Sequence, residues 1–589
     1  MTSWPHEPVL VVGAGPVGQT TALLLARWGV PSVVLDKRPA RDLVGSKAIC
    51  QQRDVLDIWA SVGAGEQIAA EGVTWTTART FHRADELFAH TFADAGSSPF
   101  PPFVNLSQSR TEEILDERIA EEPLIDLRWG QEVTDLAAHS APFTVLCTGA
   151  AGALRRTLGV TFDGFSFDDR FLICDIRTDL PGWATERRFF FDPEWNPGRQ
   201  VLVHPCPDGT FRIDWQVPAD YDLDAEVGSG ALDRRIRAII EDRPYEIVWK
   251  SVYRFHSRIA SRMRVGRVLL AGDAAHLVSP FGARGLNSGV ADAENAAWKI
   301  AHVGYGWAPE ELLESYHAER HAAARENLAV TTATMDFLVP PDAARAAYRA
   351  DVLARAADDP AAHAHVNSGR LAEPFWYHDS PLTTPDPTRP FGGRPPRGTV
   401  PPAGPGVLVP DVPCAPVPVP QRGHPAAVES QHGHLAPMRR AHSDRPNRLR
   451  GLAREGFLVL LAEGADRRAA EAAADAVDAP VRVAALDPAV AAALDACPGE
   501  AWLVRPDAHV AAVVSVPALT AALRRALGDR PERHTTAVAT AATVHSPRSS
   551  PAVDPPEGEP CPSTTAAATS RRSATPSTAA PTGASTPRS

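Results

Sequence analysis

A glycine-rich turn near the N-terminus constrains the fold of this 589-residue chain more than any other feature. The apolar run 8–12 (PVLVV) has the length of a strand, and a helical pattern follows over residues 19–28. Between them lie three glycines with the spacing G-x-G-x-x-G: Gly13, Gly15 and Gly18. In such a strand–turn–helix unit the first glycine makes the tight turn, the second lets the backbone approach a pyrophosphate, and the third lets helix and strand pack closely.

An acidic residue stands where this interpretation requires one. Residues 31–35 (PSVVL) form a second predicted strand, which ends at Asp36. A carboxylate at this place accepts hydrogen bonds from ribose hydroxyls, while the N–H groups at the start of the preceding helix face a phosphate. The N-terminal part of the chain is therefore predicted to be a Rossmann-like α/β domain that binds a dinucleotide. This motif alone does not distinguish FAD from NAD(P).

Composition narrows the class of protein and of partner. Lys and Arg number 59 against 71 Asp and Glu, a net charge of −12 without long basic runs, which disfavours nucleic acid and anionic membranes as partners. No apolar run reaches the length of about 18 residues that a membrane span needs, and the first residues lack the basic region of a secretory signal. The seven cysteines form no CxxC pair, and no metal-ligand spacing is present. We expect a soluble cytoplasmic protein without a metal.

A second motif lies far along the chain, in residues 266–300 (GRVLLAGDAAHLVSPFGARGLNSGVADAENAAWKI). A predicted strand ends at Gly272 and Asp273, and a loop leads through Pro280 into a helix that begins near Leu286. The Asp273 carboxylate can accept a hydrogen bond from a polyol hydroxyl. The N–H groups and the positive end of the helix would favour negative charge at the N1–C2=O edge of a flavin.

The two motifs together resemble those of the FAD-dependent class A flavoprotein monooxygenases, aromatic hydroxylases of the phenol and 3-(3-hydroxyphenyl)propionate hydroxylase type. GAGPVG with Asp36 and the stretch GDAAH…PFGARGLNSGVADAENAAWK carry the resemblance, which covers about residues 8–330. VRPDAHVA extends it more loosely to the C-terminal block. The resemblance implies FAD as cofactor and a Rossmann-like FAD-binding domain interleaved with an antiparallel-sheet substrate domain. It also implies a C-terminal thioredoxin-like domain.

The resemblance also implies which residues bind the cofactor. They are Gly13, Gly15, Gly18, Asp36, Lys47, Gln108, Gly272, Asp273, Gly285, Leu286 and Asn287. Lys47 stands where relatives usually carry Arg, so the charge is kept and the bidentate fork is lost. Gln108 would reach the flavin from its helix, and Asp273 would bind the ribityl or pyrophosphate region. No catalytic side chain is assigned, because the cofactor carries the chemistry.

One motif of the family is altered. A DG pair in a segment resembling ADGARSAVRR appears here as CTGAAGALRR, with Thr148 in place of the aspartate, although Gly149 and Arg155 are kept. The preceding stretch VTDLAAHSAPFTVL is also short for the hairpin that normally precedes this motif. The aspartate is implicated in binding FAD and NAD(P)H. Its replacement is therefore expected to impair reduction by the nicotinamide more than FAD binding.

Breaks in composition divide the chain. After Leu527 the chain contains no Leu, Ile, Phe, Met, Trp or Tyr, so it cannot bury enough apolar surface to offset the entropy of ordering. The predicted parts are two portions of an FAD-binding domain (1–160 and 261–375), a substrate-binding sheet domain (161–260), a Pro/Gly-rich linker (376–444), a thioredoxin-like domain (445–528) and a disordered tail (529–589). Without a CxxC pair, packing or dimerisation is the expected role of the thioredoxin-like domain.

The substrate domain is predicted from strand-like runs between residues 160 and 255, in which apolar and polar residues partly alternate. The residues singled out as substrate contacts are Trp215, Tyr253, His256 and Pro280. The alternative interpretation is that the large aromatic side chains fill the core of the sheet.

The predicted function is that of an FAD-dependent monooxygenase. The resemblance implies that NAD(P)H reduces FAD, that O2 adds to give a C4a-hydroperoxyflavin, and that an OH group passes to a small aromatic or phenolic substrate, polyketides included. Two alternatives stay open: an FAD-dependent dehydrogenase or oxidase without oxygen transfer, and a non-catalytic flavin-binding relative. A homodimer formed through the C-terminal domain is a further expectation.

Overall fold

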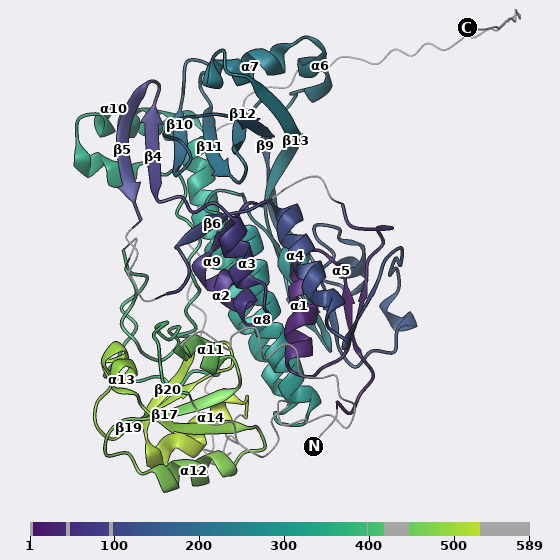
Figure 1. Ribbon diagram of the computed structural model, residues 1–589, viewed down its shortest axis with the longest axis vertical. Coiled ribbons are helices and arrows are strands. Elements are labelled where there is room, and N and C mark those ends of the chain that lie inside the picture. Colours follow the sequence, from purple (N-terminus) through teal and green to yellow (C-terminus); the bar gives the residue numbers. More distant parts are fainter. Residues whose placement is uncertain (1–3, 43–47, 93–97, 397–398, 417–446, 530–589) are drawn as a thin grey trace, which may run out of the picture. The chain divides into compact units, whose positions relative to one another are not determined.

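The computed structural model describes residues 4–42, 48–92, 98–396, 399–416 and 447–529 (Figure 1). Three predictions fall on positions outside these ranges: the role of Lys47, the linker over residues 417–444, and the tail from residue 530 onward.

A six-stranded sheet carries the N-terminal glycine turn. Its strand order is β14-β15-β8-β1-β2-β7, and all its neighbours are parallel except β14 and β15. The strands are β1 (Val9–Val12), β2 (Ser32–Leu35), β7 (Ile125–Arg128), β8 (Thr144–Leu146), β14 (Arg264–Val265) and β15 (Val268–Leu270). All four residues of β1 are buried, as expected of an apolar parallel strand covered on both faces. Segments more than 250 residues apart thus complete one sheet, since β8 joins β1 to β15.

An eight-stranded sheet forms the second layer of the molecule. Its order is β16-β13-β9-β12-β11-β10-β4-β5. The strands are β4 (Thr77–His82), β5 (Asp85–Thr91), β9 (Phe162–Thr178), β10 (Glu186–Phe191), β11 (Gln200–Cys206), β12 (Thr210–Val217), β13 (Tyr245–Ala260) and β16 (His276–Leu277). Sequence interpretation assigned residues 161–260 to this sheet. The hairpin β4–β5 extends it, because β4 pairs in parallel with β10 and continues the ladder.

The two faces of the eight-stranded sheet have different environments. Phe211, Ile213 and Trp215 of β12 pack in a buried apolar cluster with helix α7 (Ala231–Ile240). Their neighbours Arg212 and Asp214 point to the opposite face, because successive side chains of a strand alternate. At β12 the sheet therefore has one apolar side and one side that carries buried charges.

Helices connect and cover the two sheets. Besides α7 they are α1 (Pro16–Arg27), α2 (Arg53–Ala60), α3 (Gly65–Glu71), α4 (Gln108–Ala120), α5 (Ala153–Thr157), α6 (Leu223–Gly228), α8 (Arg284–Gly304), α9 (Glu314–Leu338) and α10 (Ala343–Ala356). The first helix packs against α4 and α8, and α9 packs against α8 and β13. Short 3-10 helices are η1 (Leu136–Ala138), η2 (Gly272–Ala274), η3 (Glu310–Leu313) and η4 (Pro360–His365), and a small sheet pairs β3 (Cys50–Gln52) with β6 (Phe103–Asn105).

The C-terminal block contains a four-stranded sheet of order β18-β17-β19-β20 (green to yellow in Figure 1). Its elements are α11 (Leu449–Ala453), β17 (Phe457–Leu461), α12 (Arg467–Asp475), β18 (Val481–Ala485), α13 (Pro488–Leu494), β19 (Glu500–Val504), β20 (Val510–Ser515), η6 (Val516–Ala518) and α14 (Leu519–Ala526). Asp487 caps α13 by accepting a hydrogen bond from the Ala489 N–H, and Pro488 begins it, a common start for a helix.

The segment before this block runs alongside β20. Tyr377 N donates to Gly406 O, and Gly406 N donates to Val510 O of β20, so the segment lies beside this strand. No helix lies in the described residues 376–396 and 399–416. Among the helices that the structure describes, none combines the length and apolar character that crossing a bilayer requires.

Candidate functional site

A cavity of about 580 Å³ is lined by residues of both large sheets. We call its two parts the nucleotide side and the sheet side. The nucleotide side is lined by the turns after β1, β2 and β8, the start of α4, the turn η2 and the start of α8: among others Gly13, Gly15, Asp36, Gln108, Thr148, Asp273, Gly285 and Leu286. The sheet side is lined by Trp75, Phe171, Ile173, Arg187, Leu202, His204, Arg212, Asp214 and Phe255.

The three glycines of the N-terminal turn meet three different steric demands. Gly13 has a φ of +106°, and a Cβ there would lie 2.4 Å from the carbonyl oxygen of Cys147. A Cβ on Gly18 would lie 1.8 Å from the Gly13 carbonyl oxygen, so the packing of α1 on the turn requires glycine. A Cβ on Gly15 would meet nothing within 4 Å, although Gly15 lines the cavity at the start of α1. The turn therefore leaves an open cradle at Gly15, beside helix N–H groups, that suits a pyrophosphate.

Asp36 lies at the end of β2 and is already well bonded. Its Oδ2 accepts hydrogen bonds from Ala14 N at 2.8 Å and Arg38 Nη2 at 2.9 Å, and its Oδ1 accepts from Arg38 N and Nε. Burial alone would raise the pKa of Asp36, but the bonds from Arg38 and Ala14 outweigh it and lower the pKa. A carboxylate has about four acceptor positions. A ribose hydroxyl can therefore bind here only if it replaces one of the Arg38 donors.

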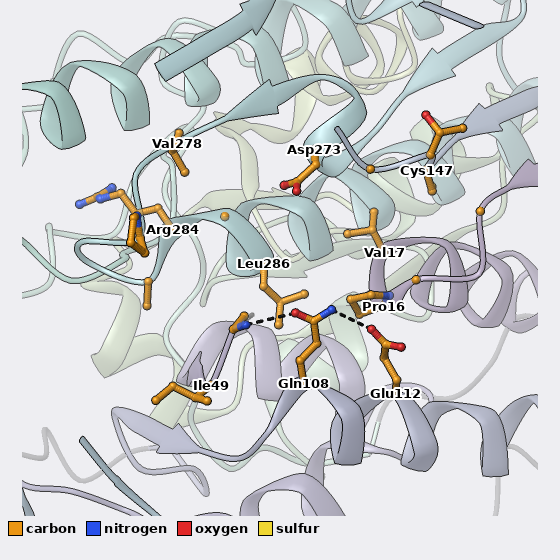
Figure 2. A pocket seen from close by; sticks show the side chains of 18 of the residues that line it. Pro16, Val17, Ile49, Gln108, Glu112, Cys147, Asp273, Val278, Arg284 and Leu286 are labelled. Atoms are coloured by element: carbon orange, nitrogen blue, oxygen red, sulfur yellow. Dashed lines mark hydrogen bonds between the residues drawn. The ribbon is translucent and has the colours of Figure 1, made fainter. Parts of the chain in front are cut away.

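Gln108 stands at the first turn of α4 and faces the cavity (Figure 2). Its Oε1 accepts a hydrogen bond from Ala48 N at 3.1 Å, and its Nε2 donates to Glu112 Oε1 at 2.8 Å. The other oxygen of Glu112 accepts from Arg41 Nη1 at 2.6 Å, and the same Arg41 nitrogen donates to Ala14 O. These contacts link the start of α4 to the glycine turn.

The turn η2 contains the GD pair, and a buried carboxylate supports it from below. Asp292 of α8 accepts hydrogen bonds from Gly272 N at 2.9 Å, from His276 Nε2 at 2.7 Å and from Arg320 Nε at 2.6 Å. Burial would raise the pKa of Asp292, but His276 and Arg320 outweigh it and lower the pKa, so the carboxylate is ionised. Asp273 is the exposed neighbour that faces the cavity (Figure 2). Asp292 was not singled out from the sequence. The available signal was its place in the helical part of the second motif.

The start of α8 brings Gly285 and Leu286 to the cavity but turns Asn287 away from it. Asn287 Nδ2 donates to Cys50 O at 3.0 Å, and its Oδ1 accepts from Gln52 N at 2.9 Å. Asn287 therefore ties α8 to β3, and it is not among the residues that line the cavity. Gly18 and Gly272 likewise support the turns without lining the cavity.

The sheet side carries a cluster of charged and polar side chains among aromatic ones. Arg212 Nε and Nη2 donate to the two oxygens of Asp175 at 2.7 and 2.8 Å, an almost fully buried ion pair. Next to it His204 Nε2 lies 3.7 Å from Asp214 Oδ2. The other polar atoms of this second pair, His204 Nδ1 and Asp214 Oδ1, have no hydrogen-bond partner among the described residues.

Burial controls the protonation of the His204–Asp214 pair. Desolvation, with the positive charges of Arg187 and Arg212, lowers the pKa of His204 well below its ordinary value. Desolvation raises the pKa of Asp214 to about 7, because the attraction of Arg212 compensates only part of it. The cavity wall therefore presents a neutral imidazole beside a carboxyl group that exchanges its proton near neutral pH.

Of the four predicted substrate contacts, Pro280 lines the cavity and the other three do not. Trp215 packs on the opposite face of its strand, where it belongs to the apolar cluster with α7. Tyr253 is also absent from the lining, and His256 bonds to Ser166 Oγ at 2.7 Å. The residue of β13 that reaches the cavity is Phe255, beside an irregularity in the pairing with β9.

Thr148 and Gly149 occupy the place of the altered DG pair, and both line the cavity. Thr148 Oγ1 donates to Ala151 O at 3.3 Å, a bond within the same turn. Arg155 Nη1 donates to Ala274 O at 2.9 Å, so this arginine links the segment to the turn η2. A group of three or more His, Cys, Asp or Glu side chains placed to hold a metal ion does not occur in the described ranges.

Comparison with known proteins agrees with this geometry. Residues 6–331 match the family model of the FAD binding domain, and residues 429–530 match that of the aromatic-ring hydroxylase C-terminal region. A 3-(3-hydroxy-phenyl)propionate/3-hydroxycinnamic acid hydroxylase of Mycobacterium sp. (strain KMS) is 28% identical over 404 residues, 65% of this chain and 69% of the relative. A flavin-dependent monooxygenase of Mycobacteroides abscessus is 32% identical over 362 residues, 55% of this chain and 73% of the relative.

A solved structure supports the fold. The flavin-dependent monooxygenase PieE, in complex with FAD and substrate, superposes with a TM-score of 0.73 at 20% identity over 89% of this chain and 99% of PieE. The first family match covers more than half of the chain, and the matched residues include the glycine turn, the GD turn and the cavity lining except Leu371. The chain therefore belongs to the FAD-dependent flavoprotein monooxygenases of the aromatic-ring hydroxylase family.

Proposed function

We propose that this protein is an FAD-dependent monooxygenase that uses NAD(P)H and O2 to hydroxylate a small aromatic or phenolic compound. One observation carries the proposal: a single cavity is lined on one side by the glycine cradle and the GD turn, and on the other by aromatic and charged side chains of a sheet. A cofactor and a substrate bound in this cavity would lie in contact. The curated relatives and the solved structure are named as monooxygenases or hydroxylases.

The nucleotide side fits FAD by its shape and its donors. The open space at Gly15 accommodates a pyrophosphate, and Asp36 with Arg38 lies where the adenosine ribose would bind. Gln108, Asp273 and Leu286 would contact the ribityl chain and the ring system. When bound, FAD supplies the transfer of electrons and oxygen that no side chain of the protein can perform.

The sheet side suits an aromatic ring that carries oxygen substituents. Phe171, Phe255 and Leu202 offer apolar surface that would bury the ring and exclude water. His204 Nε2 and Asp214 Oδ2 would bind a hydroxyl group between them, since these two atoms are 3.7 Å apart. The Asp214 carboxylate would accept the proton of that hydroxyl, and Arg187 and Arg212 would stabilise the negative charge left on the substrate oxygen.

Finer features of the protein belong to the same proposal. The division into an FAD-binding domain in two portions and a substrate domain is supported by the two sheets and the cavity that both line. The sheet order of the C-terminal block, with helices beside it, supports a thioredoxin-like domain, and no CxxC pair would give it dithiol chemistry. We also propose that NAD(P)H is the reductant and that the protein forms a homodimer through this block.

Turnover with labelled oxygen tests the proposed function. The holoenzyme is incubated with NADH or NADPH, labelled O2 and a panel of phenols, and the products are analysed by mass spectrometry. We expect one atom of label per product molecule and consumption of NAD(P)H that the substrate stimulates. Oxidised product without label would instead indicate a dehydrogenase or oxidase. A flavoprotein that consumes no NAD(P)H with any phenol of the panel would refute the proposal in favour of a non-catalytic flavin-binding protein.

The Asp214→Asn variant ties turnover to the cavity. Asparagine keeps the size of the side chain but cannot accept a proton, so kcat should fall by about 100-fold or more, the lower end of what a general base typically contributes. Asp168→Asn alters an exposed carboxylate on the strand β9 and serves as the matched control. Equal turnover of the two variants would remove the His204–Asp214 pair from the mechanism.

A further inference from the structure

A buried cluster of charged groups joins the C-terminal block to helices α8 and α9, outside the cavity. Arg505, in the turn between β19 and β20, donates from Nη1 and Nη2 to the two oxygens of Glu319 at 2.6 and 3.0 Å. The same guanidinium bonds to Asp507 Oδ2 at 2.6 Å. Lys299 Nζ donates to Glu319 Oε2 at 2.6 Å. All four side chains are at most 2% exposed.

The contacts continue from Glu319 toward the cavity. Asn295 Nδ2 donates to Glu319 Oε2 at 2.8 Å and lies 3.4 Å from the hydroxyl of Tyr377. Tyr377 belongs to the segment that runs alongside β20. Arg320 Nη1 donates to the Tyr377 hydroxyl oxygen at 3.0 Å. Tyr377 and Asn295 thus connect the C-terminal cluster to Arg320 of α9.

The last contacts reach the turn that faces the cofactor. Arg320 Nε donates to Asp292 Oδ1 at 2.6 Å, and Asp292 Oδ2 accepts from Gly272 N at 2.9 Å. Gly272 precedes Asp273, which lines the cavity. An unbroken series of polar contacts therefore runs from Arg505 in the C-terminal block to the backbone of η2.

The charges in this series balance within the interior. Arg505, Lys299 and Arg320 face Glu319, Asp507 and Asp292. Burial would raise the pKa of Glu319, but Arg505 and Lys299 outweigh it and lower the pKa, so the carboxylate is ionised. Loss of one member would leave an uncompensated charge away from water, which costs more than the pair contributes. The geometry of each member is therefore fixed by its neighbours.

We propose that the C-terminal block is a positioning element for the cofactor-facing turn η2, acting through the series Arg505, Glu319, Asn295, Tyr377, Arg320 and Asp292. The proposal rests on the proposed FAD site. It gives the block a role that needs neither dithiol chemistry nor a second subunit. Packing alone does not account for the series, because apolar side chains would close the same interface at equal or lower cost.

A second ionic cluster at the same interface provides an internal comparison. Arg454 donates from Nε to Glu294 at 2.6 Å and from Nη1 to Asp57 Oδ2 at 2.5 Å. Its guanidinium is as buried as that of Arg505, being 3% exposed. Neither of these two contacts leads to η2. Substitution of Arg454 therefore perturbs docking of the block without breaking the series.

The Tyr377→Phe substitution breaks the series with little change of volume. Its matched control is Tyr305→Phe, at the C-terminal end of α8. The hydroxyl lost there donates to the carbonyl oxygens of Trp28 and Gly29. The dissociation constant of FAD is measured by flavin fluorescence on the full chain, with the folded fraction checked by circular dichroism. We expect Tyr377→Phe to raise the FAD dissociation constant at least fivefold and to shift the visible absorption of the bound flavin, while Tyr305→Phe changes the constant less than twofold.

A second pair of variants tests the end of the series. Arg505→Met is compared with Arg454→Met at temperatures where both are equally folded, and only Arg505→Met should release FAD at least tenfold more readily. Equal FAD constants within both pairs would overturn the proposal and leave the series a packing feature. If Arg505→Met does not fold, the Tyr377→Phe comparison decides alone. A wild-type protein that fails to bind FAD would instead refute the proposed function, so the two failures are distinguishable.

Discussion

Replacement of Asp214 by asparagine should change how stability depends on pH. Burial raises the pKa of Asp214 from its ordinary value of 3.8 to about 7, since Arg212 compensates only part of the desolvation. A shift of about 3 units corresponds to about 4 kcal/mol, at about 1.4 kcal/mol per unit. When the pKa of a group is higher in the folded than in the unfolded protein, the contribution of that group to stability is fully present below the unfolded pKa. It is lost as the pH rises through the folded value.

The expected result is a stability difference that grows with pH. Asparagine does not ionise, so Asp214→Asn should gain up to about 4 kcal/mol relative to the wild type between about pH 4 and pH 8. His204 also titrates, but its pKa is lowered by burial, so its contribution is lost as the pH falls, and it is present in both proteins. The charged groups that act on Asp214 are likewise unchanged: Arg212 on the same strand, and Asp175 and Arg187 on other strands of the sheet.

Urea unfolding of the apoprotein, followed by tryptophan fluorescence at several pH values, measures this difference. Asp168→Asn, at an exposed carboxylate, controls for the loss of one negative charge. The pH profile of kcat/KM gives an independent check, because a limb that rises near pH 7 in the wild type should be missing in Asp214→Asn. A free-energy difference that is constant with pH would show that Asp214 is not held protonated in the folded protein, and would refute the reasoning.

Five further substitutions, in three tests, separate the parts of the site. Gly15→Leu should fill the open cradle and raise the FAD dissociation constant at least 100-fold in a folded protein. Gly18→Ala should instead prevent folding, because its Cβ would overlap the Gly13 oxygen. Circular dichroism and flavin titration distinguish the two outcomes. Thr148→Asp restores the carboxylate of the family motif and should accelerate flavin reduction by NAD(P)H in stopped-flow absorbance, and an unchanged rate would exclude this position from reduction. Phe255→Leu should raise KM for the aromatic substrate several-fold and Trp215→Phe should leave it within twofold, since only Phe255 lines the cavity; the reverse order in steady-state kinetics would contradict the assignment.

The glycine turn could be predicted from the sequence because its constraints are local. Gly13 must adopt a positive φ, and Gly18 must leave room for the Gly13 carbonyl, so both demands act within six residues of chain. The same holds for Asp36, which follows a strand whose place is set by its apolar pattern. Where backbone geometry selects the residue type, the motif and the structure coincide.

The sheet side could not be predicted in the same way, because strand parity decides which side chains reach the cavity. Trp215 and Asp214 are adjacent in the sequence and point to opposite faces of β12. Preference for large aromatic residues selected the wrong parity at this strand. The usable signal was the presence of Arg212 and Asp214 in an otherwise apolar run, since a charge within a buried strand requires a partner or a function.

Two buried carboxylates of this protein differ in how far hydrogen bonds and neighbouring charges offset the cost of burying them. This degree of compensation separates their roles. Asp292 has three donors, and its pKa is lowered, so its charge is stabilised without any ligand. Asp214 has one buried oxygen without a hydrogen-bond partner among the described residues, and its pKa is raised, so its charge is stabilised only in part. A fully compensated carboxylate can hold a backbone turn in place but has no capacity left to exchange a proton. An incompletely compensated one costs stability and persists where a bound molecule completes its contacts. The degree of compensation therefore assigns Asp292 to positioning and Asp214 to contact with the substrate.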